Sequence, residues 1–427
     1  MKKIFSLLFL LSFIVSCSQI MKFTEQPAAS VEQKEPYDNI DEELLQNNDK
    51  KLVVAILLPL SGKAEKVGNM MLNSAQLAMF DNKLNNIILK PYDTKGTAFG
   101  AVDAINEANR DKADVIVGPL FTQSTKAILD IAYTNNLLVL SFSDNQSLLD
   151  EKYPNLYLMG WTPKQEIDRI ISYLIDYKNF YGFSAMFPSD VYGSTVSKIF
   201  KDVIFRKDAK IVKTDFYSKD DKNLENKVNN LLNTNTFKDE VYEKYEADQA
   251  LAKAEGLSTD IEFKYTDNDK IYADALIVPD SGSELTNIAS YVANYNGKNK
   301  PLLIGTSKWL NTTLYNNVDF DNTLFVAPNP NGYNEFESEY FEAYQTYPLR
   351  IGSLAYDAIT AVMESYAKAE DKENLKYAIE NYQGFNGFNG RFRFLADGML
   401  ERKLAIIKIN NGRFEIIDYD DEPFLKY

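Results

Sequence analysis

Residues 51–62 read KLVVAILLPLSG, and this stretch decides the fold. Positions 52–58 form a short, almost continuous apolar run rich in Val and Ile, which is typical of a strand buried on both faces of a parallel sheet. Pro59 and the pair Ser61-Gly62 end the run. Apolar residues then recur at every fourth position from 67 to 79, which predicts an amphipathic helix. Strand, tight loop and helix therefore follow in that order.

The same alternation continues along the chain. Further strands are expected at 87–92, 114–117, 137–141, 183–187, 211–216, 274–278, 302–305 and 323–327, with helices at 98–109, 126–134, 165–177, 194–205, 284–295, 336–344 and 355–369. Alternating elements with short connections imply βαβ units and a doubly wound parallel sheet, so the predicted fold class is α/β. The pattern restarts after 161–163, which indicates a second lobe, and hairpins are expected near 391–394 and 404–417. A charged stretch at 233–270 interrupts it and predicts a helical surface insertion.

Composition and charge exclude several classes of function. The 427 residues are 45% hydrophobic and 13% aromatic, which is a globular composition. The net charge of −15 argues against a nucleic-acid partner. The chain has no His, and its one cysteine is Cys17, which excludes Ser-His-Asp and Cys-His catalysis and metal sites built on imidazole or thiolate. Carboxylate chemistry remains open, but we expect no enzyme activity, no metal and no cofactor.

The N-terminus reads as an export signal. Two lysines precede an apolar segment at 4–15, which has the length of a signal peptide and is too short to span a membrane. The segment ends at Ile14-Val15-Ser16-Cys17, which resembles the lipobox of bacterial lipoproteins, so 1–17 is expected to be the signal peptide and lipobox, with Cys17 lipidated. The alternative is an ordinary signal peptide with an incidental cysteine. By analogy Ser18 points to the outer membrane, and the polar residues 18–50 predict a disordered tether.

Several strings resemble the type I periplasmic-binding fold. They are VVAILLPLSG, ADVIVGPLFTQST, PSDVYG, DALIVPDSG, LAYDAI and GFNGRFRFLADG, and together they extend from residue 51 to about residue 420. Within that fold the chain is most similar to the penicillin-binding-protein activator lipoproteins, on ILLPLSG, YDTKGTA, VGPLF, LIGTSKW and the charged insertion. The resemblance implies two lobes crossed three times, near 160–162, 328–330 and 382–384. Lobe 1 would be 51–161 with 330–382, and lobe 2 would be 162–329 with 383–427.

The resemblance also implies a ligand cleft at the carboxyl ends of the strands. In the related branched-chain amino-acid receptors, a serine after the third strand and an Ala-Thr or Ala-Ser pair after the fourth hold the ligand carboxylate. Here the first position is Thr122 or Gln123, and the second is Asp144-Asn145. An aspartate beside a ligand carboxylate would repel it by ~1–4 kcal/mol. This substitution argues against an amino-acid receptor.

We expect one of three functions, and the resemblance favours the first. The first is an envelope lipoprotein that binds and stimulates a peptidoglycan synthase, that is, a penicillin-binding protein. The second is a lipid-anchored solute receptor that delivers an amino acid or related small molecule to the permease of an ABC importer. The third, an enzyme, is disfavoured because most acid–base chemistry recruits His.

The candidate ligand residues follow the predicted strands. They are Ser61, Gly62, Thr122, Gln123, Ser143, Asp144, Tyr192, Asp280, Thr306 and Trp309. Each has a simpler interpretation. The serines and Thr306 are also typical helix caps, Tyr192 is equally compatible with packing at the hinge, and Trp309 with a place in the core. Carboxylates at strand ends, as at Asp144 and Asp280, would suit a cationic or amine-bearing ligand.

Overall fold

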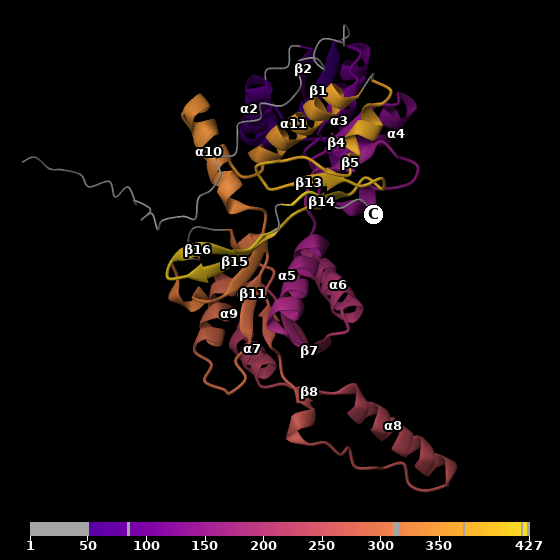
Figure 1. Ribbon diagram of the computed structural model, residues 1–427, viewed down its shortest axis with the longest axis vertical. Coiled ribbons are helices and arrows are strands. Elements are labelled where there is room, and N and C mark those ends of the chain that lie inside the picture. Colours follow the sequence, from indigo (N-terminus) through magenta and orange to yellow (C-terminus); the bar gives the residue numbers. More distant parts are fainter. Residues whose placement is uncertain are drawn as a thin grey trace, which may run out of the picture. The chain divides into compact units, whose positions relative to one another are not determined.

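The computed structural model describes residues 51–82, 86–310, 314, 316–369, 372–419 and 422–424 (Figure 1). The predicted signal peptide, Cys17 and the predicted tether lie outside the described residues. Among the helices that the structure describes, none is both long and apolar enough to cross a membrane.

Lobe 1 is built on a parallel five-stranded sheet in the order β2-β1-β3-β4-β5. Its strands are β1 (Leu52–Leu58), β2 (Ile87–Asp93), β3 (Val115–Val117), β4 (Leu138–Ser141) and β5 (Leu156–Leu158). The apolar run at 52–58 is β1, which lies between β2 and β3 in this sheet. Its even-numbered side chains pack against α2 (Glu65–Asn82) and α11 (Gly352–Lys368), while Ala55 and Leu57 pack against α3 (Ala98–Arg110) and α4 (Thr122–Thr134). Burial on both faces is why the run does not alternate with polar residues.

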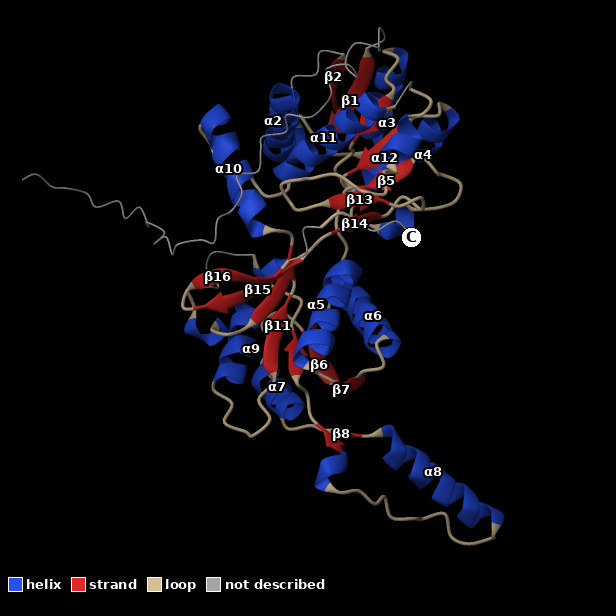
Figure 2. Ribbon diagram, viewed as in Figure 1, coloured by secondary structure: helices blue, strands red, loops and turns tan. Residues whose placement is uncertain are grey.

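Lobe 2 is built on a seven-stranded sheet in the order β16-β15-β12-β11-β10-β6-β7. Five of its strands are parallel: β6 (Gly182–Pro188), β7 (Lys210–Tyr217), β10 (Ala275–Ile277), β11 (Leu302–Gly305) and β12 (Leu324–Ala327). The hairpin β15 (Ala405–Asn410) and β16 (Arg413–Asp418) adds two antiparallel strands. Helices α5 (Pro163–Lys178) and α6 (Val191–Arg206) cover one face, and α7 (Leu224–Leu232) and α9 (Ser283–Ala293) cover the other (Figure 2). The predicted α/β fold with parallel sheets between helices is therefore confirmed.

Three crossings join the lobes, but the third one lies later than expected. The first two lie between β5 and α5 and between β12 and α10 (Pro330–Tyr344). The third was predicted at 382–384. Instead Phe385, and the hairpin β13 (Phe392–Phe394) and β14 (Leu400–Arg402), pack into the lobe 1 core, so the chain crosses only between β14 and β15. The assignment of the segment up to Arg402 to lobe 2 was wrong.

The glycine-rich loop before β13 explains this error. Its repeated glycines look like a flexible connection between lobes. In the structure they bring the loop backbone against the buried carboxylate of Asp357 on α11. The Phe388 N–H donates to Asp357 Oδ1 at 2.8 Å, and a Cβ on Gly387 would lie 2.6 Å from the Asp357 carboxylate. The glycines therefore serve close packing within lobe 1 rather than a crossing.

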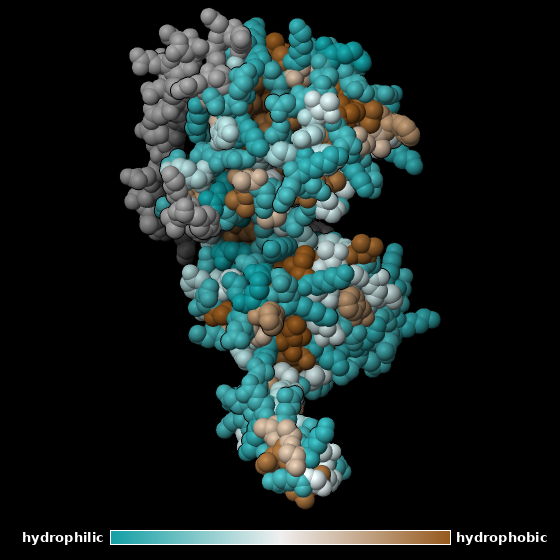
Figure 3. Space-filling model, turned by 90° about the vertical axis from the view of Figure 1, so that its right-hand side faces the viewer, coloured by the Kyte–Doolittle hydropathy of each residue, from teal (hydrophilic) through white to brown (hydrophobic). Residues whose placement is uncertain are grey.

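The insertion forms a separate small unit, here called the arm. It consists of the antiparallel pair β8 (Thr236–Phe237) and β9 (Lys270–Ile271), with α8 (Asp239–Ala254) and a return segment between them. Figure 1 shows α8 standing away from the sheet of lobe 2, and Ala252 is the one buried residue of this helix. Figure 3 shows a mixed surface of hydrophilic and apolar residues on the arm. The remaining helix of lobe 1 is α12 (Leu375–Ile379).

Candidate ligand-binding site

Two hydroxyl groups meet at the carboxyl ends of β3 and β4. Thr122 begins α4, directly after the loop that follows β3, and Ser143 follows β4 by two residues. Because neighbouring parallel strands end at the same edge of the sheet, their loops meet, and Thr122 Oγ1 lies 2.9 Å from Ser143 Oγ. Behind them Thr125 Oγ1 lies 2.7 Å from Ser141 Oγ, which fixes the strand end. The structure thus brings together two of the residues predicted for the site.

Ser61 pairs with a carboxylate that the sequence reasoning missed. Its Oγ donates to Asp93 Oδ2 at 2.6 Å, and its N–H donates to Asp93 Oδ1 at 3.2 Å. Burial opposes the charge on Asp93, but these bonds and those from the N–H groups of Lys95 and Leu60 hold the pKa of Asp93 below its usual value. The Ser61 side chain makes no capping bond. Gly62 follows in the left-handed region, at φ +80°. Asp93 is the last residue of β2. Its position at a strand end is the sequence feature that could have predicted a place in the site.

Asp144 lies beside the first crossing and is exposed, as is Gln123 on α4. A Cβ placed on Gly160 would lie 2.9 Å from both Cα and Cβ of Asp144, so the two backbones pack closely. A charge at this position meets any ligand near the Thr122–Ser143 pair at short range, where Coulomb interactions are strongest. Asp144 therefore stays a predicted ligand residue.

Tyr192 and Thr306 form the corresponding polar group of lobe 2. Tyr192 lies in the first turn of α6, whose N-terminus is capped by Asp190 through a 2.7 Å bond from the Gly193 N–H. Lys308 places its ammonium 4.1 Å from the centre of the Tyr192 ring. Burial raises the pKa of the Tyr192 hydroxyl, and the nearby Thr306 hydroxyl opposes that rise.

Thr306 follows β11, and its side chain is completely buried. No described residue offers its Oγ1 a hydrogen bond of normal geometry. A buried hydroxyl without a partner costs about 1–3 kcal/mol. In the described part of the chain, four other buried hydroxyls share this condition, those of Ser124, Ser184, Thr360 and Ser365, but Thr306 is the one that belongs to the predicted site. The Thr306 side chain also makes no capping bond, so the simpler interpretation as a helix cap does not account for it.

Glu166 connects this group to the first crossing, and the sequence reasoning missed it. It lies in the first turn of α5, and its carboxylate accepts a 3.0 Å bond from the Ser307 N–H. Trp161, in the crossing itself, donates from Nε1 to Ser307 Oγ at 3.4 Å. Burial raises the pKa of Glu166 to about 7, against the hydrogen bonds from Ser307 and the charge of Lys308. An acidic residue in the first turn of a helix is usually explained by its favourable interaction with the helix dipole. For this reason the contact of Glu166 with Ser307 was not predicted.

Asp280 and Trp309 have partners within lobe 2. Asp280 Oδ2 accepts a 2.7 Å bond from the Tyr217 hydroxyl. Trp309 is completely buried, donates from Nε1 to the Val278 carbonyl at 3.1 Å and packs edge-on against Phe320. Its assignment as a ligand contact was wrong, and the alternative, a core residue, describes it. A Trp beside a strand end is compatible with either place, so no sequence pattern distinguishes a ligand contact from a core residue here.

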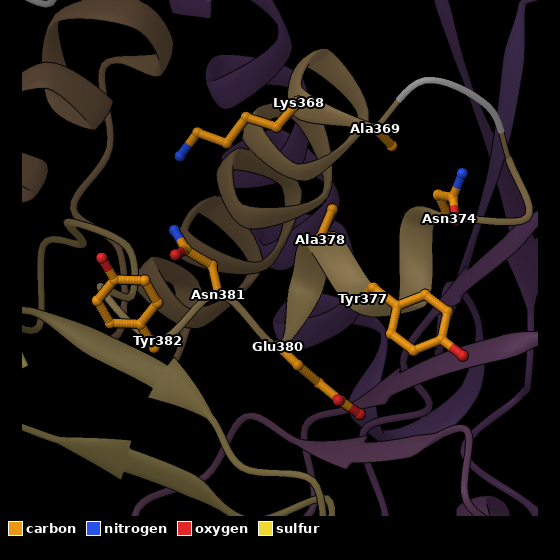
Figure 4. Close-up of a pocket in the computed structure, with 8 residues that line it drawn as sticks. All are labelled: Lys368, Ala369, Asn374, Tyr377, Ala378, Glu380, Asn381 and Tyr382. Carbon is orange, nitrogen blue, oxygen red and sulfur yellow. The ribbon is translucent and has the colours of Figure 1, made fainter. Parts of the chain in front are cut away.

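A surface pocket of about 640 Å³ lies elsewhere on lobe 1, along the end of α11 and along α12 (Figure 4). It is lined by Lys368, Ala369, Asn374, Tyr377, Ala378, Glu380, Asn381 and Tyr382. Figure 4 shows the rings of Tyr377 and Tyr382 directed to opposite sides, and Glu380 is bound to the Tyr157 hydroxyl. The pocket contains none of the residues predicted for ligand binding. Within the described ranges no three acidic, His or Cys side chains are grouped as metal ligands.

Comparisons with known proteins bear on the fold. A family model described as "Periplasmic binding protein" matches residues 51–235. An uncharacterized protein of Rickettsia prowazekii is 23% identical over 375 residues, which cover 87% of this chain and 90% of that protein.

Solved structures match over most of the chain. A putative branched-chain amino acid ABC transporter from Rhodospirillum rubrum has a TM-score of 0.70 at 13% identity, covering 86% of this chain and all of that one. A branched-chain amino acid transporter substrate binding protein from Streptococcus pneumoniae, in complex with isoleucine, has a TM-score of 0.52 at 18% identity, covering 88% of this chain and all of that one. At these identities the likeness establishes the fold, and the chain therefore has the α/β two-domain fold of type I periplasmic binding proteins.

Proposed function

We propose that this protein is a non-catalytic receptor of the bacterial envelope that binds an amine-bearing small molecule and delivers it to an ABC permease. The observation that carries the proposal is the completely buried Thr306 hydroxyl, which makes no hydrogen bond of normal geometry with any described residue and has the Tyr192 hydroxyl as its polar neighbour. A ligand could bond to this hydroxyl only after the side chains that cover it move, and such a bond would remove the cost of the unpaired hydroxyl. The Thr122–Ser143 pair offers further hydroxyl groups at the strand ends of lobe 1.

The charge at the site supports an amine as the ligand's recognised group. Asp144 is exposed beside the Thr122–Ser143 pair, and a ligand carboxylate at this place would be repelled by ~1–4 kcal/mol. An ammonium group would be attracted by a similar amount. The Thr122 and Ser143 hydroxyls contact each other rather than a general base. Together with the lack of His in the chain, this supports binding without catalysis.

A thermal-shift panel tests the proposal. We expect primary amines without an α-carboxylate to raise the melting temperature, since a ligand at 100 times its Kd adds ~2.7 kcal/mol. Thr306→Val should weaken this rise because the ligand loses a hydrogen bond. Thr134→Val, at an exposed hydroxyl on α4, should leave it unchanged. The proposal fails if no amine shifts the transition, or if Thr306→Val responds as the unmodified protein does.

A second candidate function is stimulation of a peptidoglycan synthase, as the resemblance to the penicillin-binding-protein activators predicts. The charged insertion was one feature of that resemblance, and it forms an ordered arm on lobe 2. An arm that stands away from the ligand loops is suited to contact with another protein. Synthase turnover with and without the purified protein distinguishes this function from solute delivery.

Lipidation of Cys17 is the expected means of attachment, with the outer membrane as the expected site. The N-terminal sequence supports it, because two lysines are followed by an apolar segment and then by the cysteine. Membrane-extracted protein should have the intact mass of a chain that begins at an acylated Cys17, and Cys17→Ser protein should leave the membrane fraction. An unmodified Cys17, or a Cys17→Ser protein that stays with the membrane, would contradict the prediction.

A further inference from the structure

The arm has a small core of its own. Five aromatic side chains pack together around Phe263, with ring centroids 5.1 Å from Phe237 and Tyr245 and 5.5 Å from Tyr242. Tyr265 packs at a tilt against Phe237, with ring centroids 4.5 Å apart, and also contacts Phe263 at 5.9 Å. These contacts hold α8 against its return segment without help from the sheet of lobe 2. The arm is therefore a packed substructure rather than an irregular loop between two strands.

Helix α8 has two different faces. Val241, Tyr245 and Ala252 follow helical spacing on the side of the aromatic core. The opposite side, here called the outer stripe, consists of Glu240, Glu243, Glu246, Ala247, Ala250, Leu251 and Ala254, all exposed. Leu251 is 59% exposed, and Leu257, just beyond the helix, is 62% exposed. The outer stripe is thus acidic in its first half and apolar in its second half, and no described element covers it.

Helix stability alone accounts for only part of this pattern. Asp239 and Glu240 lie in the first turn, where acidic residues favour the helix dipole. Glu243 and Glu246 lie beyond that turn, and both are exposed. Exposed Leu251 and Leu257 contribute nothing to the aromatic core, and together with the alanines they leave an apolar patch in water.

The charge of the arm limits what can cover the outer stripe. Between Thr236 and Ile271 there are ten acidic residues and five lysines, a net charge of −5. A second copy of the arm would bring the same negative charge against it, and an anionic lipid surface would be repelled. A protein face with basic residues beside an apolar ridge matches both halves of the outer stripe.

We propose that the outer stripe of α8 is a docking surface for a basic face of another envelope protein. This surface is separate from the ligand loops, so the inference does not depend on which small molecule binds. The acidic half speeds and orients the encounter, and the alanine and leucine half is buried in the complex.

Photo-crosslinking in intact cells tests this assignment. A photoreactive amino acid replaces Ala250 on the outer stripe, and Lys264 on the return segment serves as the control position. We expect an adduct from Ala250, and not from Lys264, and mass spectrometry should place it in a partner segment that carries Lys or Arg beside apolar residues. An adduct to a second copy of this chain, to lipid or to an acidic segment would overturn the proposal, as would no adduct at Ala250.

Charge reversal provides the matched comparison. Glu243→Lys with Glu246→Lys should lower the adduct yield at Ala250 roughly fivefold or more, because the encounter loses its electrostatic attraction. Asp260→Lys with Glu262→Lys changes the charge of the arm equally, on the return segment, and should leave the yield within about twofold. Melting temperatures of both variants show whether the fold is retained. Equal losses in the two variants would overturn the proposal.

Discussion

Replacing Asp357 by Ala is expected to lower the free energy of unfolding by about 3–5 kcal/mol, the largest effect that we predict for a single substitution. Asp357 and Arg402 are completely buried, with Arg402 Nη1 3.3 Å from Asp357 Oδ2. Without the carboxylate, the guanidinium stays buried with no compensating charge. Its Nε and Nη2 already have no hydrogen-bond partner among the described residues. The Phe388 N–H loses its acceptor as well.

Urea unfolding measures this effect, and an exposed ion pair provides the control. Asp168 and Arg206 lie 3.3 Å apart, with side chains 38% and 43% exposed. Asp168→Ala should therefore cost less than about 1 kcal/mol. If Asp357→Ala changed stability as little as Asp168→Ala does, the buried pair would not be an important part of the lobe 1 core.

Glu166→Gln is expected to remove about 3 kcal/mol of pH dependence from the stability of lobe 2 between pH 5 and pH 8. Burial raises the pKa of Glu166 from its ordinary value of 4.5 to about 7 in the folded protein. The protonated form is therefore favoured by folding. Its stabilising contribution is complete below pH 4.5 and is lost as the pH rises through 7, at 1.36 kcal/mol per unit of pKa difference. Glutamine cannot ionise, and its side-chain oxygen still accepts from the Ser307 N–H.

Unfolding at several pH values checks this prediction. Lys308 and Tyr192 are the charged and titratable neighbours of Glu166, and both remain in the variant. Glu339→Gln is a useful comparison. Burial and its acidic neighbours raise the pKa of Glu339 to about 7, but the residue is only partly buried, so solvent screens the effect more than at Glu166. The slope should change less for Glu339→Gln than for Glu166→Gln. An unchanged slope in Glu166→Gln would show that its carboxylate is not the group that titrates.

Elements whose periodicity is strong could be predicted from the sequence. The apolar run at 52–58 requires two covered faces, and its side chains do divide between two helical layers. The hairpin at the C-terminal end and the helical insertion also followed from local patterns. The third crossing could not be predicted in this way. A run of glycines is typical of a flexible connection, but the glycines before Phe392 pack around a buried carboxylate, and the two cases have the same sequence pattern.

The site could be predicted only in part for a related reason. Strand order placed Thr122 and Ser143 at one edge of the sheet, and the structure brings them together. Contacts between residues far apart in the chain leave no local signal, so the Ser61–Asp93 bond and the Glu166–Ser307 bond were not foreseen. Trp309 shows the opposite error, because a large aromatic residue near a strand end suits the core as well as a ligand.

Isothermal titration of the unmodified protein and of Asp144→Asn most directly tests the central claim, that this fold holds an amine-recognising ligand site. We expect no tight binding of leucine, isoleucine or valine. We also expect binding of a primary amine without an α-carboxylate, weakened at least about tenfold, or 1.4 kcal/mol, by Asp144→Asn. Micromolar binding of isoleucine that Asp144→Asn leaves unchanged, with no binding of the amines, would contradict the claim.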